Sequence, residues 1–135
     1  MTPAEEITAA AEKLRRLATA ASTDRRGRPT THWAVRYQPG VLPGSPEQRD
    51  QPVRLVATDS GTDNHLLHGG PSGPGARGTG PRIGADQGRY IAAMGPDVGE
   101  KLARWLDAAA QDAREIGPDP HALAMARTIN TGGQL

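Results

Sequence analysis

Three closely spaced arginines, Arg25, Arg26 and Arg28, lie in a polar segment that follows a predicted helix and precedes a predicted strand. Guanidinium groups bind phosphate oxygens through forked, charge-assisted hydrogen bonds. Arg77 and Arg82, in a Gly/Pro-rich segment further along the chain, could add to the same cluster. These five arginines are therefore the predicted ligand-binding residues, and the predicted ligand is a phosphate group of a nucleic acid or of a nucleotide signal.

Two aromatic residues, Trp33 and Tyr37, follow the arginines closely and could stack on bases. The alternative is that the arginines form a solvated loop and the aromatic rings lie on the buried face of a strand. The chain has a pI near 8.3, whereas domains that bind nucleic acid usually exceed about 9. Nucleic acid or a nucleotide is therefore a possible partner but not the favoured one.

A second pair of residues with possible chemistry is His65 and His68, which flank two leucines. A zinc site takes three or four ligands at fixed spacing, and the chain has no cysteine to supply them. The remaining ligands would come from other histidines and from carboxylates: His32, His121, Asp59 and Asp63. Paired surface histidines in a loop are commoner than metal sites, so the sequence predicts neither a metal nor another cofactor.

No motif indicates catalysis. Residues 73–78 match the spacing GxGxxG, but that motif works between a strand and a helix, and here more glycine and proline surround it. There is no GxSxG element and no phosphate-binding loop that ends in GK[ST]. The sequence therefore predicts a protein that is not an enzyme.

Length and composition favour one small domain. The chain has 135 residues, a net charge of +1 and no cysteine. No run approaches the ~18 apolar residues of a membrane span, and the N-terminus lacks the pattern of a signal peptide. We therefore expect a cytoplasmic protein that does not act on membranes.

Large apolar side chains are scarce. Isoleucine, leucine and valine together number 20, phenylalanine is absent, and many of the apolar residues are alanine. A chain with so few bulky side chains can complete its core with a second copy of itself, so we expect a homo-oligomer. The residues expected to pack or to form the interface are Leu14, Leu17, Tyr90, Ile91, Leu102, Trp105 and Leu106.

The first part of the chain predicts a helix followed by two strands. Thr2 to Glu5 match a capping box, with proline at the first helical position, and predict a helix over residues 3–21. Its narrow apolar seam would suit a coiled-coil-like contact, but packing on the sheet of the same domain is the favoured expectation. Alternating apolar and polar residues predict half-buried strands over residues 31–37 and 53–58. Residues 59–84 are rich in glycine and proline and predict one long flexible loop.

The C-terminal part predicts two to three helices. Asp86 is a plausible N-cap for the first of them, and the Gly95–Pro96 pair is expected to end it with the glycine in the left-handed conformation. A second, amphipathic helix is expected over residues 97–116 and a third over 120–129, followed by a frayed tail at 130–135. The predicted fold class is therefore α+β, with a small two- or three-stranded antiparallel sheet.

The order of these elements resembles the Ead-like phage and prophage accessory proteins, which include small actinobacterial phage proteins and Streptomyces proteins. The similarity rests on the block Tyr90-Ile91-Ala92-Ala93-Met94-Gly95-Pro96 and the helix after it, with a weaker match in the N-terminal helix and at Trp33. Residues 24–31 separate Trp33 from the first helix, and Gly88-Arg89 stand where the family often has Asn-Ala.

This resemblance implies a phage or prophage accessory protein without a defined enzymatic activity, and it transfers no catalytic residue. The favoured expectation is a non-enzymatic binding protein that acts as a small oligomer on a host protein or a small ligand. The alternative is a phosphate-recognising protein of the anti-defence type, which sequesters a nucleic acid or a nucleotide signal. A third hypothesis is a metal-assisted hydrolase that uses His65 and His68.

Overall fold

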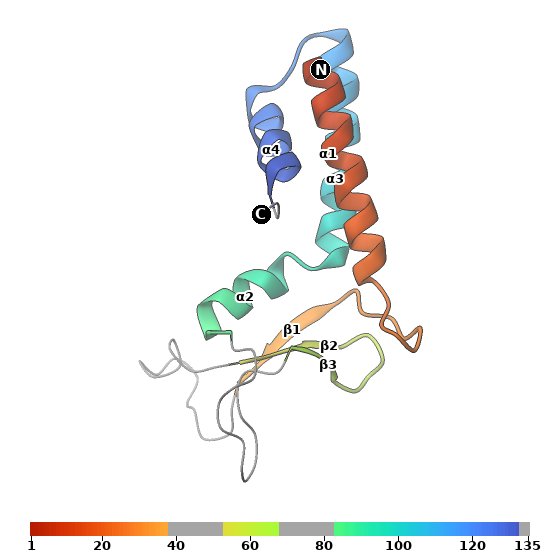
Figure 1. Ribbon diagram of the computed structural model, residues 1–135, viewed down its shortest axis with the longest axis vertical. Coiled ribbons are helices and arrows are strands. Elements are labelled where there is room, and N and C mark those ends of the chain that lie inside the picture. The colour runs from red at the N-terminus through yellow and green to blue at the C-terminus, as the bar shows by residue number, and fades with distance from the viewer. Residues whose placement is uncertain (38–52, 68–82, 133–135) are drawn as a thin grey trace. The chain divides into compact units, whose positions relative to one another are not determined.

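The computed structural model (Figure 1) describes residues 1–37, 53–67 and 83–132. The elements along these residues are α1 (Pro3–Ala21), β1 (Trp33–Arg36), β2 (Arg54–Ala57), β3 (Asn64–Leu67), α2 (Ala85–Ala93), α3 (Pro96–Glu115) and α4 (Pro120–Thr131). A leading helix, a three-stranded antiparallel sheet and three further helices confirm the predicted α+β class. No helix in these ranges combines the length and the apolar character that a membrane crossing requires.

The chain divides into two compact units. The helical unit contains residues 1–21 and 96–135, and the sheet unit contains residues 22–95. Each unit has its own cluster of buried apolar residues. The single domain expected from the chain length stays a prediction.

Helix α1 begins with the capping box that the sequence predicts. The Glu5 N–H donates to Thr2 Oγ1 at 3.2 Å, and the Thr2 N–H donates to Glu5 Oε2 at 2.8 Å. These reciprocal bonds satisfy two backbone donors that a helix start otherwise leaves unpaired. The helix ends at Ala21, the residue at which the apolar periodicity predicts its end.

The core of the helical unit is built mainly from alanine. Its two large, fully buried side chains are Ile7 and Leu106, and the other buried members are Ala10, Ala11, Ala109, Ala110, Ala122 and Ala126. Small side chains allow helix backbones to approach closely. The approach of α3 to α1 is an example, because a Cβ added at Gly99 of α3 would lie 3.4 Å from the Cβ of Ala18 in α1. The expectation that α1 packs on the sheet is therefore wrong, because its buried face meets α3 and α4.

Helix α4 is held along α1 by polar contacts as well. The Lys13 ammonium donates to the carbonyl oxygens of Ile129 at 2.8 Å and Gly132 at 3.0 Å, at the end of α4 where the helix dipole favours a cation. Asn130 Nδ2 donates to the Glu6 carbonyl at 3.0 Å. The predicted fraying from residue 130 is therefore wrong for residues 130 and 131, which belong to α4. Residues 133–135 lie outside the described residues.

The sheet has the order β1-β2-β3, and both pairings are antiparallel. Trp33 lies opposite Ala57, Arg36 lies opposite Arg54, and Val56 lies opposite His65. The third strand corrects the expectation of one irregular loop over residues 59–84, because residues 64–67 pair with β2 after a turn at Gly61 with φ +79°. Residues 68–82 of that expected loop lie outside the described residues.

Helix α2 covers the apolar face of this sheet. A Cβ built on Gly88 would lie 2.5 Å from Val53 Cγ2 and 3.2 Å from Val35 Cγ1, so only glycine lets the helix approach this closely. Ile83 and Ala85 complete the cluster, with Val35, Tyr37 and Leu67 packed against it.

The ends of α2 differ from the prediction. Gly84, not Asp86, is the N-cap, and Asp86 lies in the first turn, where its charge still suits the helix dipole. Among the described residues the glycines with positive φ are Gly27, Gly61 and Gly117, so the left-handed conformation expected at Gly95 is wrong. Gly95 is instead buried beside the Trp33 ring. A Cβ added at Gly95 would lie 3.4 Å from Trp33 Cγ.

Candidate phosphate-binding site

The arginine segment folds into a tight turn between α1 and β1. Its two sides are joined by hydrogen bonds from the Thr30 N–H to the Ser22 carbonyl at 2.8 Å and from the Asp24 N–H to the Arg28 carbonyl at 3.0 Å. Gly27, at the tip, has φ +76°, a conformation that side chains with a Cβ rarely adopt. The turn is therefore a fixed local structure and not an open loop.

Asp24 organises this turn. Its Oδ1 accepts from the backbone N–H groups of Arg26 at 2.8 Å and Arg28 at 2.9 Å, and its Oδ2 accepts from Arg28 Nε at 2.7 Å and Asn64 Nδ2 at 2.9 Å. The bond from the Arg28 backbone N–H is the main cause that holds the pKa of the Asp24 carboxyl well below its usual range, with Asn64 and the Arg28 side chain adding to it. Asp24 is therefore charged throughout the physiological pH range.

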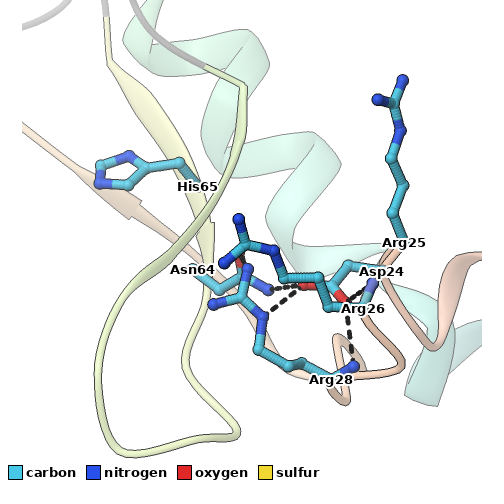
Figure 2. A pocket seen from close by; sticks show the side chains of 6 residues that line it. All are labelled: Asp24, Arg25, Arg26, Arg28, Asn64 and His65. Atoms are coloured by element: carbon cyan, nitrogen blue, oxygen red, sulfur yellow. Dashed lines mark hydrogen bonds and ion pairs between the residues drawn. The ribbon is translucent and has the colours of Figure 1, made fainter.

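Asn64 ties the turn to strand β3. It donates to Asp24 and accepts from Arg28 Nη2 at 3.2 Å, so the Arg28 guanidinium is held by two partners. Figure 2 shows the Arg26 and Arg28 side chains extending toward Asn64, whereas Arg25 points away from Asp24. The orientation of Arg28 is thus fixed before any ligand arrives.

The guanidinium groups of Arg25 and Arg26 have no hydrogen bond or ion pair to the residues that the structure describes. Both side chains line a pocket of about 360 Å³, together with the residues that surround Asp24: Asp24, Arg28, Asn64 and His65 (Figure 2). Three cations share this pocket with one carboxylate, which Arg28 already neutralises. The pocket therefore has a surplus of positive charge.

The structure brings together three of the five predicted arginines. Arg25, Arg26 and Arg28 line one pocket, whereas Arg77 and Arg82 lie outside the described residues, as does the GxGxxG match at residues 73–78.

Sequence reasoning missed two residues of this site, Asp24 and Asn64. The carboxylate of an aspartate at the start of a turn can accept from the backbone N–H groups of the residues that follow it. A glycine three residues after the aspartate is a further signal of such a turn. The sequence Asp24-Arg25-Arg26-Gly27 carries that signal. Nothing in the sequence indicates that Asn64, forty residues away, would meet the same carboxylate.

The two aromatic residues are not available for stacking on a base. Trp33 is half-buried, and its Nε1–H donates to the Thr30 carbonyl at 2.7 Å. The Tyr37 ring packs in the sheet core, with the Arg89 guanidinium 5.7 Å from its centroid. Of the two alternatives for these residues, the structure favours core packing.

The histidines give no metal centre in the residues that the structure describes. No group of three or more histidine and carboxylate side chains in those ranges could hold a metal ion. His65 lines the arginine pocket, and His68 lies outside the described residues.

The residues expected to pack or to form an interface fall into two groups. Leu106 is fully buried, and Leu14 and Leu102 are partly buried against the helical core. The other four are exposed: Leu17 at 51%, Tyr90 at 71%, Ile91 at 37% and Trp105 at 45%.

Comparison with known proteins adds no relative. No protein-family model, no curated protein and no solved structure matches this chain. The resemblance to the Ead-like phage proteins therefore stays a prediction, and the candidate site rests on its own geometry.

Proposed function

We propose that this protein is a non-enzymatic binding protein whose arginine turn recognises a phosphate group. The observation that carries the proposal is the pocket in which Asp24 and Asn64 orient Arg28 while the Arg25 and Arg26 guanidinium groups keep their donors available. A phosphate oxygen could accept from these groups without any rearrangement of the turn, and a preformed site loses little entropy on binding.

The distribution of charge supports the same proposal. The sheet unit carries nine basic and six acidic side chains, whereas the helical unit carries seven basic and nine acidic ones. The pI of the whole chain averages over these two units and hides the basic one. The objection that the chain is too weakly basic to bind polyanions therefore does not apply to the unit that carries the site.

Isothermal titration calorimetry with inorganic phosphate and with a nucleoside triphosphate tests this function. Replacing both Arg25 and Arg26 by alanine should weaken binding about thirty- to a hundred-and-fifty-fold, because each charge-assisted hydrogen bond contributes about 1 to 1.5 kcal/mol in an open site. The control is the double variant Arg16→Ala/Lys101→Ala, which removes the same two charges from exposed positions on α1 and α3. Equal affinity in the wild type and the Arg25/Arg26 variant, or an equal loss in the control, would refute the proposal.

Self-association is a second candidate property, carried by a separate observation. Leu17 of α1 and Trp105 of α3 belong to the helical unit and remain about half exposed there. Large exposed apolar side chains are common at protein interfaces, and tryptophan is enriched at their centres. We propose that these residues contact a second copy of the chain.

Light scattering coupled to gel filtration tests this association. The wild type should give a mass above the 14.2 kDa of one chain, and Trp105→Gln should shift it toward that value. The matched control is Ile116→Gln, which changes a residue that is 86% exposed at the far end of α3. A wild type that elutes as a monomer at tens of micromolar would remove this candidate.

A further inference from the structure

The sheet has one apolar and one charged face, and the charged face continues from the arginine turn. Residues of one strand alternate between the two faces, so the side chains on the same side as Val35 and Val53 face α2. Arg54 is the neighbour of Val53 in the chain, and it therefore points to the opposite side. Arg36 is its direct cross-strand partner and shares that side.

His65 belongs to the same charged face. It lies opposite Val56, which is two residues from Arg54 and therefore on the same side of β2. His65 also lines the arginine pocket, so the face and the pocket are continuous at this residue. Val56 itself is fully buried, so a ligand on this face would meet the charged side chains and not the strand surface.

Asp63 lies among these cations. Arg36 donates to it through Nε at 2.9 Å and Nη2 at 3.1 Å. The hydrogen bonds from Arg36 are the main cause that lowers the pKa of Asp63, and Arg54 and His65 lie near enough to lower it further. One carboxylate thus balances two arginines that stand opposite each other, an arrangement that costs stability in a sheet without such a counter-ion.

The length of this charged face exceeds what one phosphate can contact. His65, where the arginine pocket meets this face, lies opposite Val56, and Arg54 is two residues further along β2. Two strand residues span about 7 Å, well over twice the distance between two oxygens of one phosphate. A ligand that uses both ends must therefore carry phosphates at more than one position.

Resting on the phosphate recognition proposed above, we infer that the physiological ligand is a chain of linked phosphates, of the kind that forms the backbone of single-stranded nucleic acid. It binds the arginine turn at one end and Arg54, with Arg36, at the other. Because Trp33 and Tyr37 are engaged on the apolar side of the sheet, the contacts described here read phosphates and not base sequence.

Fluorescence anisotropy with a labelled oligothymidylate of about ten nucleotides tests this inference, since single-strand sites cover roughly 4 to 16 nucleotides. The oligonucleotide should bind at least ten-fold more tightly than inorganic phosphate. Arg54→Gln should weaken binding of the oligonucleotide and leave binding of inorganic phosphate unchanged. It should also lower the slope of log K against log salt by about 0.7, the value for one single-strand phosphate contact. Arg104→Gln, an equal charge change on α3, is the control.

Asp63→Asn should change the affinity for the oligonucleotide in the direction opposite to Arg54→Gln. It removes the carboxylate that competes with phosphate for Arg36, so it should tighten oligonucleotide binding several-fold while leaving the binding of inorganic phosphate at the turn unchanged. A purely structural role of the Arg36–Asp63 pair would instead weaken binding. Circular dichroism spectra of both variants show whether the fold is retained.

The outcomes separate this inference from the proposed function. If inorganic phosphate binds through Arg25 and Arg26 but the oligonucleotide binds no more tightly and Arg54→Gln has no effect, the linked-phosphate inference is wrong and phosphate recognition stands. If neither phosphate nor oligonucleotide binds, the proposed function itself fails. Competition by inorganic polyphosphate at equal phosphate concentration, with no competition by duplex DNA, would assign the recognition to a flexible phosphate chain and not to nucleic acid alone.

Discussion

Two helical glycines should respond to alanine with opposite signs, because their surroundings differ. Gly88 of α2 faces Val53 and Val35, and an added Cβ would lie 2.5 Å from Val53 Cγ2. Favourable carbon contacts lie at about 3.5 to 4.0 Å, and the fully buried, β-branched Val53 has little freedom to move away. Gly99 of α3 is open by comparison, since its added Cβ would meet the Ala18 Cβ at 3.4 Å, an ordinary contact.

The magnitudes follow from two opposing effects. Alanine is favoured over glycine inside a helix by about 0.8 to 1.0 kcal/mol, which applies at both positions. Overpacking costs about 1 to 3 kcal/mol, which applies at Gly88 alone, and an approach of 2.5 Å places it near the upper end. We expect Gly88→Ala to lower the free energy of unfolding by about 1 to 2 kcal/mol and Gly99→Ala to raise it by about 0.5 to 1 kcal/mol.

The two tryptophans allow each unit to be followed separately in urea denaturation. Trp33 lies in the sheet unit and Trp105 in the helical unit, and the chain has no others. Gly88→Ala is measured by Trp33 fluorescence in a Trp105→Phe background, and Gly99→Ala by Trp105 fluorescence in a Trp33→Phe background.

A double-mutant cycle identifies the cause of the Gly88 effect. Val53→Ala removes the methyl group that the new Cβ would overlap, so Gly88→Ala should cost at least 1 kcal/mol less in that background. An equal cost in both backgrounds, or a more stable Gly88→Ala variant, would refute the packing of α2 on this face. The assignment of Arg54 and Arg36 to the opposite face depends on that packing.

The remaining predictions concern single polar groups. Lys13→Met should destabilise the helical unit by about 1 to 2 kcal/mol in urea, because the carbonyls at the end of α4 lose a charged donor. Thr2→Ala should cost about 1 kcal/mol in thermal unfolding, since it removes the cap of α1. For Asp59, burial raises the pKa, but hydrogen bonds from Thr31 and His32 outweigh it and lower the pKa below its unfolded value near 3.9. Its contribution should therefore be complete above about pH 5 and disappear as the pH falls through the folded pKa, so the stability difference between wild type and Asp59→Asn should shrink in acid.

Local rules predicted the helices well, because their signals lie within a few residues. Thr2 and Glu5 identify the start of α1, and Asp119 and Pro120 identify the start of α4, where the Asp119 carboxylate accepts from the His121 N–H at 2.9 Å. The predicted helix over 97–116 differs from α3 by one residue at each end. Such caps need no tertiary information.

The third strand and the site required tertiary information. Residues 64–67 are few and lie in a segment rich in turn formers, so their pairing with β2 has no local signal. The arginines were recognisable as a cluster, but Asn64 joins them only because β3 brings it beside Asp24. The charged face depends on the same register, since Arg36, Arg54 and His65 are distant in sequence and share a side only after the strands pair.

The scarcity of bulky side chains has a different consequence from the one that composition alone predicts. The composition predicts association, because a chain with many alanines and few bulky side chains is expected to have an incomplete core. The core cluster of the helical unit instead groups six buried alanines around Ile7 and Leu106, and close approach of the helices replaces side-chain volume. The number of bulky residues in the sequence therefore does not predict self-association. Self-association depends on where the large side chains lie, since Leu17 and Trp105 remain exposed whereas Leu106, next to Trp105 in the chain, is fully buried.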